Sequence, residues 1–130
     1  MRRACVTESE TTSQPTIAVL SRDIFFGMRI REALKQLGYA MALVKTESDL
    51  ASQMDASPAL ALVDFNTPID WDAVASAIED HPAVPVVAFG AHTDAEGFQR
   101  AKAAGVARAI SNGAFTQQLP DLIARYARQE

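Results

Sequence analysis

The stretch ALVDFNTP, residues 61–68, decides how the whole chain is interpreted. A mostly apolar run ends at Asp64, and Pro68 follows four positions later. Continuous apolar runs are typical of strands that are buried on both faces of a parallel sheet. In such sheets the functional crevice lies beyond the carboxyl ends of the strands. The sequence therefore places Asp64 in that crevice, either as a functional acid or as a cap of a neighbouring loop or helix.

Segments before and after this stretch alternate between two patterns. Short apolar runs predict strands, and apolar residues at helical spacing, with capping residues and glycine stops, predict helices. We expect strands at 16–20, 41–45, 59–65, 84–90 and 106–110, and helices at 23–38, 46–54, 70–80, 94–105 and 116–128. The last helix contains Pro120, which must then lie in its first turn. Strict alternation predicts one α/β domain with a doubly wound, five-stranded parallel sheet.

The composition limits the classes of function. The chain has 130 residues, of which 48% are apolar and 22% charged, and a net charge of −4, so nothing suggests a nucleic-acid partner. It has no apolar run long enough to span a membrane. A single cysteine, Cys5, excludes a disulfide framework and fits a reducing cytoplasm. Residues 1–15 are polar without periodicity and are expected to form a flexible tail before a domain at 16–130.

Other conspicuous residues give little sign of catalysis. His81 and His92 have no partners at metal-ligand spacing, so we expect both to be solvated loop residues. The sequence contains no dinucleotide-binding glycine motif and no defensible catalytic triad, which predicts a protein that is not an enzyme. Trp71 is expected to cover a loop. Phe25 and Phe26 are adjacent, so either Phe26 is core with its neighbours half covered, or both form an apolar patch for a partner at the crevice mouth with Ile24 and Met28.

Residues 16–128 resemble the receiver domain of bacterial two-component response regulators. The resemblance is carried by VDFNTP, in which Asp64 and Pro68 match a D-x-x-x-P pattern. It is supported by LKQLGY after the first helix, VPVVAFGA at the fourth strand and AKAAGVARAI before the fifth. The resemblance implies a flavodoxin-like sheet with strand order 2-1-3-4-5. It also implies that Asp64 occupies the position of the phospho-acceptor.

Several residues depart from the family pattern. Where the family has a pair of acids that hold Mg²⁺ after the first strand, this chain has Ser21 and Arg22, and Asp23 follows one position later. Phosphoryl transfer to a carboxylate needs a cation that screens the developing negative charge. The arginine would instead place a guanidinium beside Asp64 and compete with a metal. We therefore expect an Arg22–Asp64 ion pair and no standard metal site.

The remaining family positions are also altered. Gly90 replaces the hydroxyl residue at the end of the fourth strand, Asn112 the lysine after the fifth, and Ala109 the switch aromatic. The standard coupling between hydroxyl and aromatic is thus not expected. The complete set of crevice neighbours expected around Asp64 is Ser21, Arg22, Asp23, Asn66, Gly90 and Asn112.

These observations predict a stand-alone pseudo-receiver, a degenerate signalling domain that acts through protein–protein interaction in the cytoplasm and needs no cofactor. One alternative is a genuine phospho-acceptor, with Asp23 and Asp64 as metal ligands and Arg22 or Asn112 on the phosphoryl group. A second is a flavodoxin-like module that binds a small anion through Arg22 and Asn112. The expected partner is another signalling protein: a histidine kinase, an effector, or a second copy in a homodimer.

Overall fold

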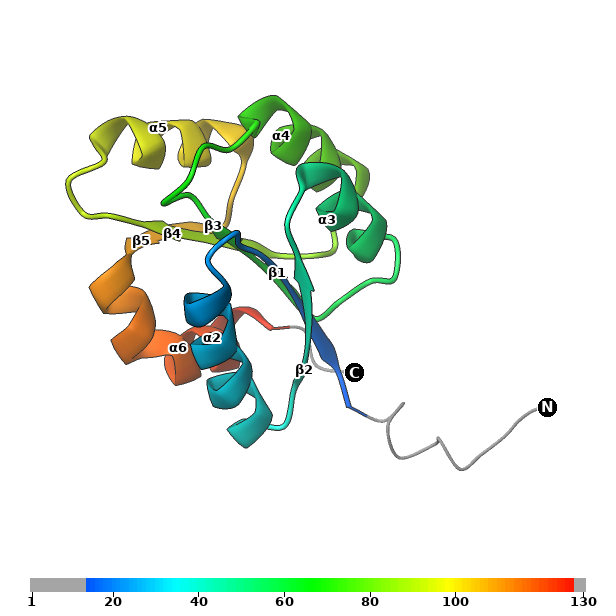
Figure 1. Ribbon diagram of the computed structural model, residues 1–130. Coiled ribbons are helices and arrows are strands. Elements are labelled where there is room, and N and C mark those ends of the chain that lie inside the picture. The colour runs from blue at the N-terminus through cyan, green and yellow to red at the C-terminus, as the bar shows by residue number, and fades with distance from the viewer. Residues whose placement is uncertain (1–13, 128–130) are drawn as a thin grey trace.

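The structure is a computed structural model, and it describes residues 14–127 of the chain (Figure 1). Strands and helices alternate along the chain. The strands are β1 (Thr16–Leu20), β2 (Ala40–Val44), β3 (Leu60–Asp64), β4 (Val86–Gly90) and β5 (Arg108–Ser111). The helices are α2 (Ile24–Gln36), α3 (Glu47–Met54), α4 (Trp71–Asp80), α5 (Ala95–Ala104) and α6 (Asn112–Tyr126).

The five strands form one parallel sheet in the order β2-β1-β3-β4-β5. This confirms the predicted fold class and strand order. Each strand is connected to the next one along the chain by a helix, as crossovers between parallel strands require. In the register, Leu20 lies opposite Val63 and Asp64 opposite Phe89. The carboxyl ends of β1, β3 and β4 therefore meet at one edge of the sheet.

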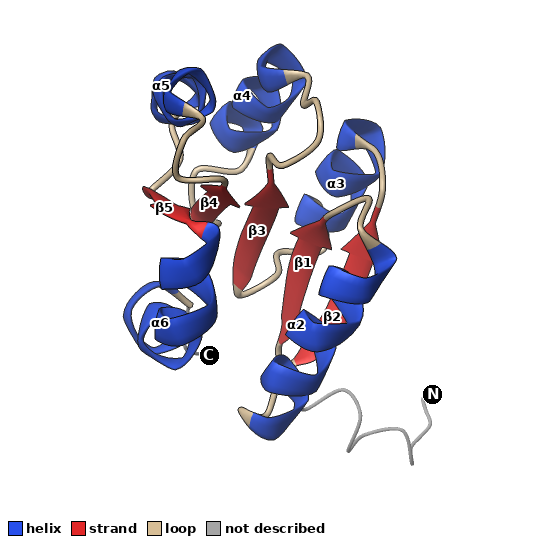
Figure 2. Ribbon diagram, turned by 60° about the vertical axis from the view of Figure 1, so that its left-hand side comes forward, coloured by secondary structure: helices blue, strands red, loops and turns tan. Residues whose placement is uncertain are grey.

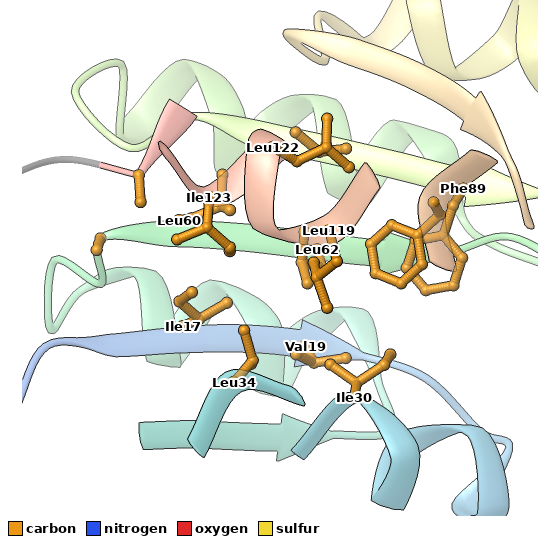
Figure 3. Close-up of a cluster of buried hydrophobic side chains, with 14 of the residues drawn as sticks. Ile17, Val19, Ile30, Leu34, Leu60, Leu62, Phe89, Leu119, Leu122 and Ile123 are labelled. Atoms are coloured by element: carbon orange, nitrogen blue, oxygen red, sulfur yellow. The ribbon is translucent and has the colours of Figure 1, made fainter. Parts of the chain in front are cut away.

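Helices cover both faces of the sheet. In Figure 1, α3, α4 and α5 lie above it, and α2 and α6 lie side by side below it; Figure 2 shows the same two layers from another side. Because side chains alternate along a strand, Val19 and Leu62 belong to one core cluster while Leu20 and Val63 belong to the other. Figure 3 shows the cluster between the sheet and α2 and α6. Two buried faces explain why the strands read as continuous apolar runs.

Most predicted boundaries lie within two residues of the observed ones. Polar side chains cap the first turns of α3 and α4. Thr46 caps α3 by accepting from the backbone N–H of Asp49, and Asp70 caps α4 by accepting from that of Ala73. Gly105, at φ +103°, ends α5 in the left-handed conformation.

The start of α6 was predicted wrongly. The helix begins at Asn112 and not at 116, because the Ser111 side chain caps it by accepting from the backbone N–H of Ala114. Pro120 consequently lies in the helix interior and not in its first turn. The pair Asn112-Gly113 is typical of a loop. Ser111, a residue type that favours helix N-caps, was the signal that a helix begins there.

One expectation falls on residues of which the structure describes very little, and another is answered by the described residues. The tail predicted at 1–15, with Cys5, lies almost wholly outside the described residues. Between residues 14 and 127, no helix is both long enough and apolar enough to cross a membrane.

Candidate functional site

Asp64 is the last residue of β3, and its side chain is buried although it is acidic. Only 1% of the residue is exposed. Its Oδ2 accepts a hydrogen bond of 2.8 Å from the Ser21 hydroxyl, and its Oδ1 accepts from the backbone N–H and the side-chain amide of Asn66 at 2.8 and 2.6 Å. Both carboxylate oxygens are thus engaged by neutral donors, which meets the requirement that a buried carboxylate be hydrogen-bonded.

Ser21 is positioned by the strand before it. Leu20 points to one face of the sheet, so Ser21 follows on the opposite face, the side on which Asp64 continues from Val63. The backbone N–H of Ser21 donates to Val44 on β2, and its hydroxyl accepts from the backbone N–H of Asp23 at 3.2 Å. The hydroxyl therefore has a fixed direction toward Asp64, as expected for a crevice neighbour.

Asp23 is the N-cap of α2. Its Oδ1 accepts from the backbone N–H groups of Phe25 and Phe26 at 3.0 and 3.1 Å. Capping of this kind satisfies helix donors that otherwise have no partner. The carboxylate at this position therefore serves the helix.

Asn66 and Asn112 connect Asp64 to the start of α6. Each of the two side-chain amides donates to the other's oxygen, at 2.9 and 2.8 Å. The Asn66 amide donates to Asp64 as well, so both of its hydrogens have acceptors. A neutral chain of hydrogen bonds thus runs from the buried carboxylate to the residue that stands where the family has a lysine.

Arg22 does not pair with Asp64, so the predicted ion pair is wrong. Its guanidinium is 3.2 Å from the Glu47 carboxylate and donates to the backbone carbonyl of Pro68 at 3.0 Å. Glu47 also accepts from the backbone N–H of Asp70 at 2.9 Å. The arginine therefore links α3 to the loop after β3, outside the hydrogen bonds of Asp64. The anionic-ligand alternative, which relied on Arg22 in the crevice, loses that contact.

Glu47 was missed by the sequence analysis. Partial burial raises the pKa of its carboxyl, but the hydrogen bond from Asp70 and the charge of Arg22 outweigh burial and lower the pKa below its ordinary value of 4.5. The available signal was its place in the first turn of the helix after β2, because β2 lies beside β1 and their carboxyl ends share one edge.

Gly90 lies at the end of β4 and makes room for Phe65. A Cβ at position 90 would meet the Phe65 ring at 2.3 Å. That ring is 5% exposed and packs edge-on against Phe98, with centroids 5.2 Å apart, and beside Trp71 at 5.9 Å. An aromatic side chain therefore fills the space where the resemblance implies a hydroxyl, and Trp71 covers it as predicted.

The two histidines differ. His92 is exposed, as expected. The expectation for His81 was wrong: its Nδ1 lies 2.9 Å from the Ala77 carbonyl and its Nε2 lies 2.7 Å from Asp55. Hydrogen bonding to that carbonyl and to Asp55 raises the pKa of His81 above 6.5, while desolvation opposes the rise.

The residues around Asp64 do not fit the Mg²⁺ that the resemblance implies. Hard divalent cations are held mainly by carboxylate oxygens. Here Ser21 occupies one oxygen of Asp64, and the carboxylate of Asp23 caps α2. Residues 14–127 contain no group of three His, Cys, Asp or Glu side chains that could hold a metal.

A crevice of about 510 Å³ opens beside these residues. Its lining includes three residues of the predicted set, Asp23, Asn66 and Asn112. It also includes Arg29 on α2, six residues after Asp23, which the sequence analysis did not single out. Arg29 lies on a helix, away from the strand end, and belongs to no sequence motif. Nothing in the sequence therefore pointed to it.

Comparison with known proteins identifies the fold. No protein-family model matches the sequence, and no curated protein matches it significantly. Solved structures do match. The chain is similar to the chemotaxis protein CheY4 of Vibrio cholerae, with a TM-score of 0.74 and 14% identity. The match covers 87% of this chain and 98% of CheY4.

Two further structures agree. HP1043, an orphan response regulator of H. pylori, is similar with a TM-score of 0.72 and 16% identity. The match covers 86% of this chain and 96% of HP1043. The signal receiver domain of an HD-domain-containing protein from Pseudomonas fluorescens matches 87% over 94%, with a TM-score of 0.73 and 18% identity. The chain therefore has the response-regulator receiver fold.

Proposed function

We propose that this protein is a pseudo-receiver: a receiver-like signalling domain that works by binding another protein and does not use metal-dependent phosphorylation of Asp64. The receiver fold supports a role in signalling. The observation that carries the proposal is the state of the carboxylate. Its oxygens accept hydrogen bonds from Ser21 and Asn66, and no second acid between residues 14 and 127 takes part in these bonds.

The chemistry of phosphoryl transfer explains why this arrangement matters. Attack by Asp64 on a phosphodonor would bring two negative groups together, and catalysis of such a step depends on positioning and on cations that stabilise the charge. In the crevice of this protein, neutral amides of Asn66 and Asn112 stand beside Asp64. The guanidinium of Arg22 is directed to Glu47.

The test is the mass of the intact protein after incubation with acetyl phosphate or phosphoramidate and Mg²⁺, with Asp64→Asn as the control. We expect the mass of the wild type to stay unchanged. A gain of one phosphoryl group that is absent from Asp64→Asn would show that the protein is a genuine phospho-acceptor, and the proposal would be wrong.

The arginine needs a test of its own. Arg22→Asp removes the contact with Glu47 and adds an acid at a position where the family carries one. Because Arg22 does not touch Asp64, we expect this variant to remain unphosphorylated under the same conditions. Phosphorylation of Arg22→Asp would show that the arginine alone prevents the reaction.

A further inference from the structure

The exposed side of α2 is apolar where it begins, at the rim of the crevice. Phe26 packs into the core against Phe89, but Phe25 is 81% exposed, and Ile24 and Met28 are 53% and 49% exposed. These three side chains lie within one turn of each other on the helix surface. Scattered exposed apolar residues are ordinary, whereas a contiguous group on one helix indicates an interaction site.

Unpaired cations adjoin this apolar group. Arg29, Arg31 and Lys35 are exposed on α2, and none of them takes part in an ion pair among residues 14–127. Arg31 and Lys35 are four residues apart, a spacing at which like charges repel on a helix. Carboxylates on a bound partner would relieve that repulsion. We call Ile24, Phe25, Met28, Arg29, Arg31 and Lys35 the α2 surface.

The α2 surface is continuous with two hollows. An apolar groove of about 120 Å³ lies between α2 and α6, which are side by side in Figure 1. The groove and the crevice beside Asn66 share three lining residues, Phe26, Arg29 and Thr116. A partner on the α2 surface can therefore place an apolar side chain in the groove and a polar one at the crevice.

Charge is segregated between the two layers of the molecule. Residues 46–99 contain ten of the sixteen acidic residues and none of the twelve lysines and arginines. That segment supplies α3, α4 and the first half of α5, whose second half carries Arg100 and Lys102. These three helices cover the face opposite to α2 (Figure 2). Although the net charge is −4, an acidic partner is thus attracted to the α2 side and repelled from the other.

We infer that the α2 surface is the docking site for a protein partner whose contacting surface is apolar and flanked by carboxylates. This rests on the proposed function and names the chemistry of its partner. An anionic membrane would also attract the cations. The α2 surface, however, adjoins the groove and the polar rim formed by Asp23, Asn66 and Asn112, and the side chains of a protein can enter the first and pair with the second.

The probe is a synthetic amphipathic peptide with leucines on one helical face and glutamates on both flanks. Its binding to the full chain is followed by amide chemical shifts. We expect saturable binding below about 1 mM, a weak affinity, with the shifts centred on 24–35. The same peptide with every glutamate replaced by lysine should not bind. Equal binding of the two peptides, no binding of the acidic one, or shifts centred elsewhere would overturn the inference.

Variants test which side chains are responsible. Phe25→Ser, and separately Arg31→Glu with Lys35→Glu, should weaken binding roughly tenfold or more. These residues are exposed, so the fold should be retained. Matched controls are Leu37→Ser, an exposed apolar residue at the other end of α2, and Lys102→Glu, an exposed cation on α5; both should bind like the wild type. Controls that lose binding as strongly as the test variants would contradict the inference.

The same variants test whether a second copy of the chain or a membrane binds the α2 surface instead. Sedimentation of the chain alone shows whether a second copy binds, and flotation with phosphatidylglycerol vesicles shows whether a membrane does. Association that depends on Phe25 in either experiment would overturn the inference in favour of that occupant. None of these measurements uses a phosphodonor. Phosphorylation of Asp64 would therefore refute the proposed function while leaving the docking result intact, and the reverse also holds.

Discussion

At the scale of single residues, Ser21 determines what Asp64 can do. Its hydroxyl donates to Oδ2 at 2.8 Å in a fully buried position. The resemblance to receiver domains predicted Ser21 as a crevice neighbour of Asp64. It could not predict the partner of Arg22, because Glu47 is 25 residues away in sequence and reaches Arg22 only through the packing of α3 beside β1.

Replacing Ser21 by an acid should make the stability of the protein depend on a divalent cation. In Ser21→Asp, a second carboxylate would adjoin Asp64 in place of a donor, and losing a buried hydrogen bond to a charged group costs roughly 2 kcal/mol. We expect the free energy of unfolding by urea to fall by at least that amount without metal and to recover with Mg²⁺. Ser21→Asn, which is neutral and of the same size, should show no response to Mg²⁺. Equal stability of both variants in metal-free buffer would contradict this account of the site.

A second residue-scale prediction concerns Gly90. Gly90→Ala would place a Cβ against the Phe65 ring, which is confined by Phe98 and Trp71. Overpacking of a core typically costs about 1–3 kcal/mol, and we expect a loss of unfolding free energy in that range. In Phe65→Leu the same glycine substitution should cost less, because the ring is gone. A double-mutant cycle without coupling between the two positions would show that Phe65 is not the reason for the glycine.

At the scale of elements, His81 joins α3 to α4. It lies just after α4 and contacts Asp55, which ends α3. Both ring nitrogens face oxygen acceptors, and only the imidazolium can donate from both. The link between the two helices is therefore strongest when His81 is protonated.

This link should weaken as the pH rises. Since folding raises the pKa of His81 above its ordinary 6.5, its contribution is complete below that value and is lost as the pH rises through the higher value of the folded state. The difference in unfolding free energy between the wild type and His81→Gln should thus shrink between about pH 6 and pH 8. Asp55→Asn should reduce this pH dependence. A difference that grows with pH would reverse the assigned sign.

Pro120 offers a second test at this scale. It is exposed in the interior of α6 and cannot donate a hydrogen bond to the preceding turn. Pro120→Ala should therefore stabilise the protein by about 1–3 kcal/mol. Part of this gain is offset because alanine gives the unfolded chain more conformational freedom than proline does. The comparison is Gln117→Ala, another exposed site on the same helix, which should change stability little. A loss of stability in Pro120→Ala would indicate that α6 needs the proline.

Elements were more predictable than the contacts between them. Strand β1 was predicted with its observed bounds, because an apolar run buried on both faces is a strong local signal. The start of α6 was missed because Asn112 and Gly113 are common in loops, and the helix there depends on the cap at Ser111. Gly90 was read as a lost hydroxyl, whereas its physical role depends on Phe65, a contact between two strands that no local pattern contains.

At the scale of the whole molecule, charge segregation should limit stability. Residues 46–99, which supply α3, α4 and the first half of α5, carry acids without intervening lysines or arginines. Negative charge therefore exceeds positive charge in that layer, although Arg100 and Lys102 follow in α5. Salt shortens the screening length from roughly 30 Å at 0.01 M to 8 Å at 0.15 M. Between these concentrations we therefore expect the free energy of unfolding to rise, as measured by urea titration at constant pH.

Two variants separate segregation from net charge. Glu79→Gln on α4 and Gln117→Lys on α6 each make the net charge more positive by one, and both sites are exposed. Glu79→Gln removes an acid from the acidic layer and from the carboxyl end of a helix, where a negative charge is unfavourable. It should stabilise the protein at low salt by a few tenths of a kcal/mol, as exposed charges do, and flatten its salt response. Gln117→Lys adds a positive charge to the layer that contains α2. It should neither stabilise the protein at low salt nor flatten its salt response. If both variants shifted the salt response equally, total charge would be the cause; if only Glu79→Gln does, the cause is the separation that leaves the α2 side attractive to an acidic partner.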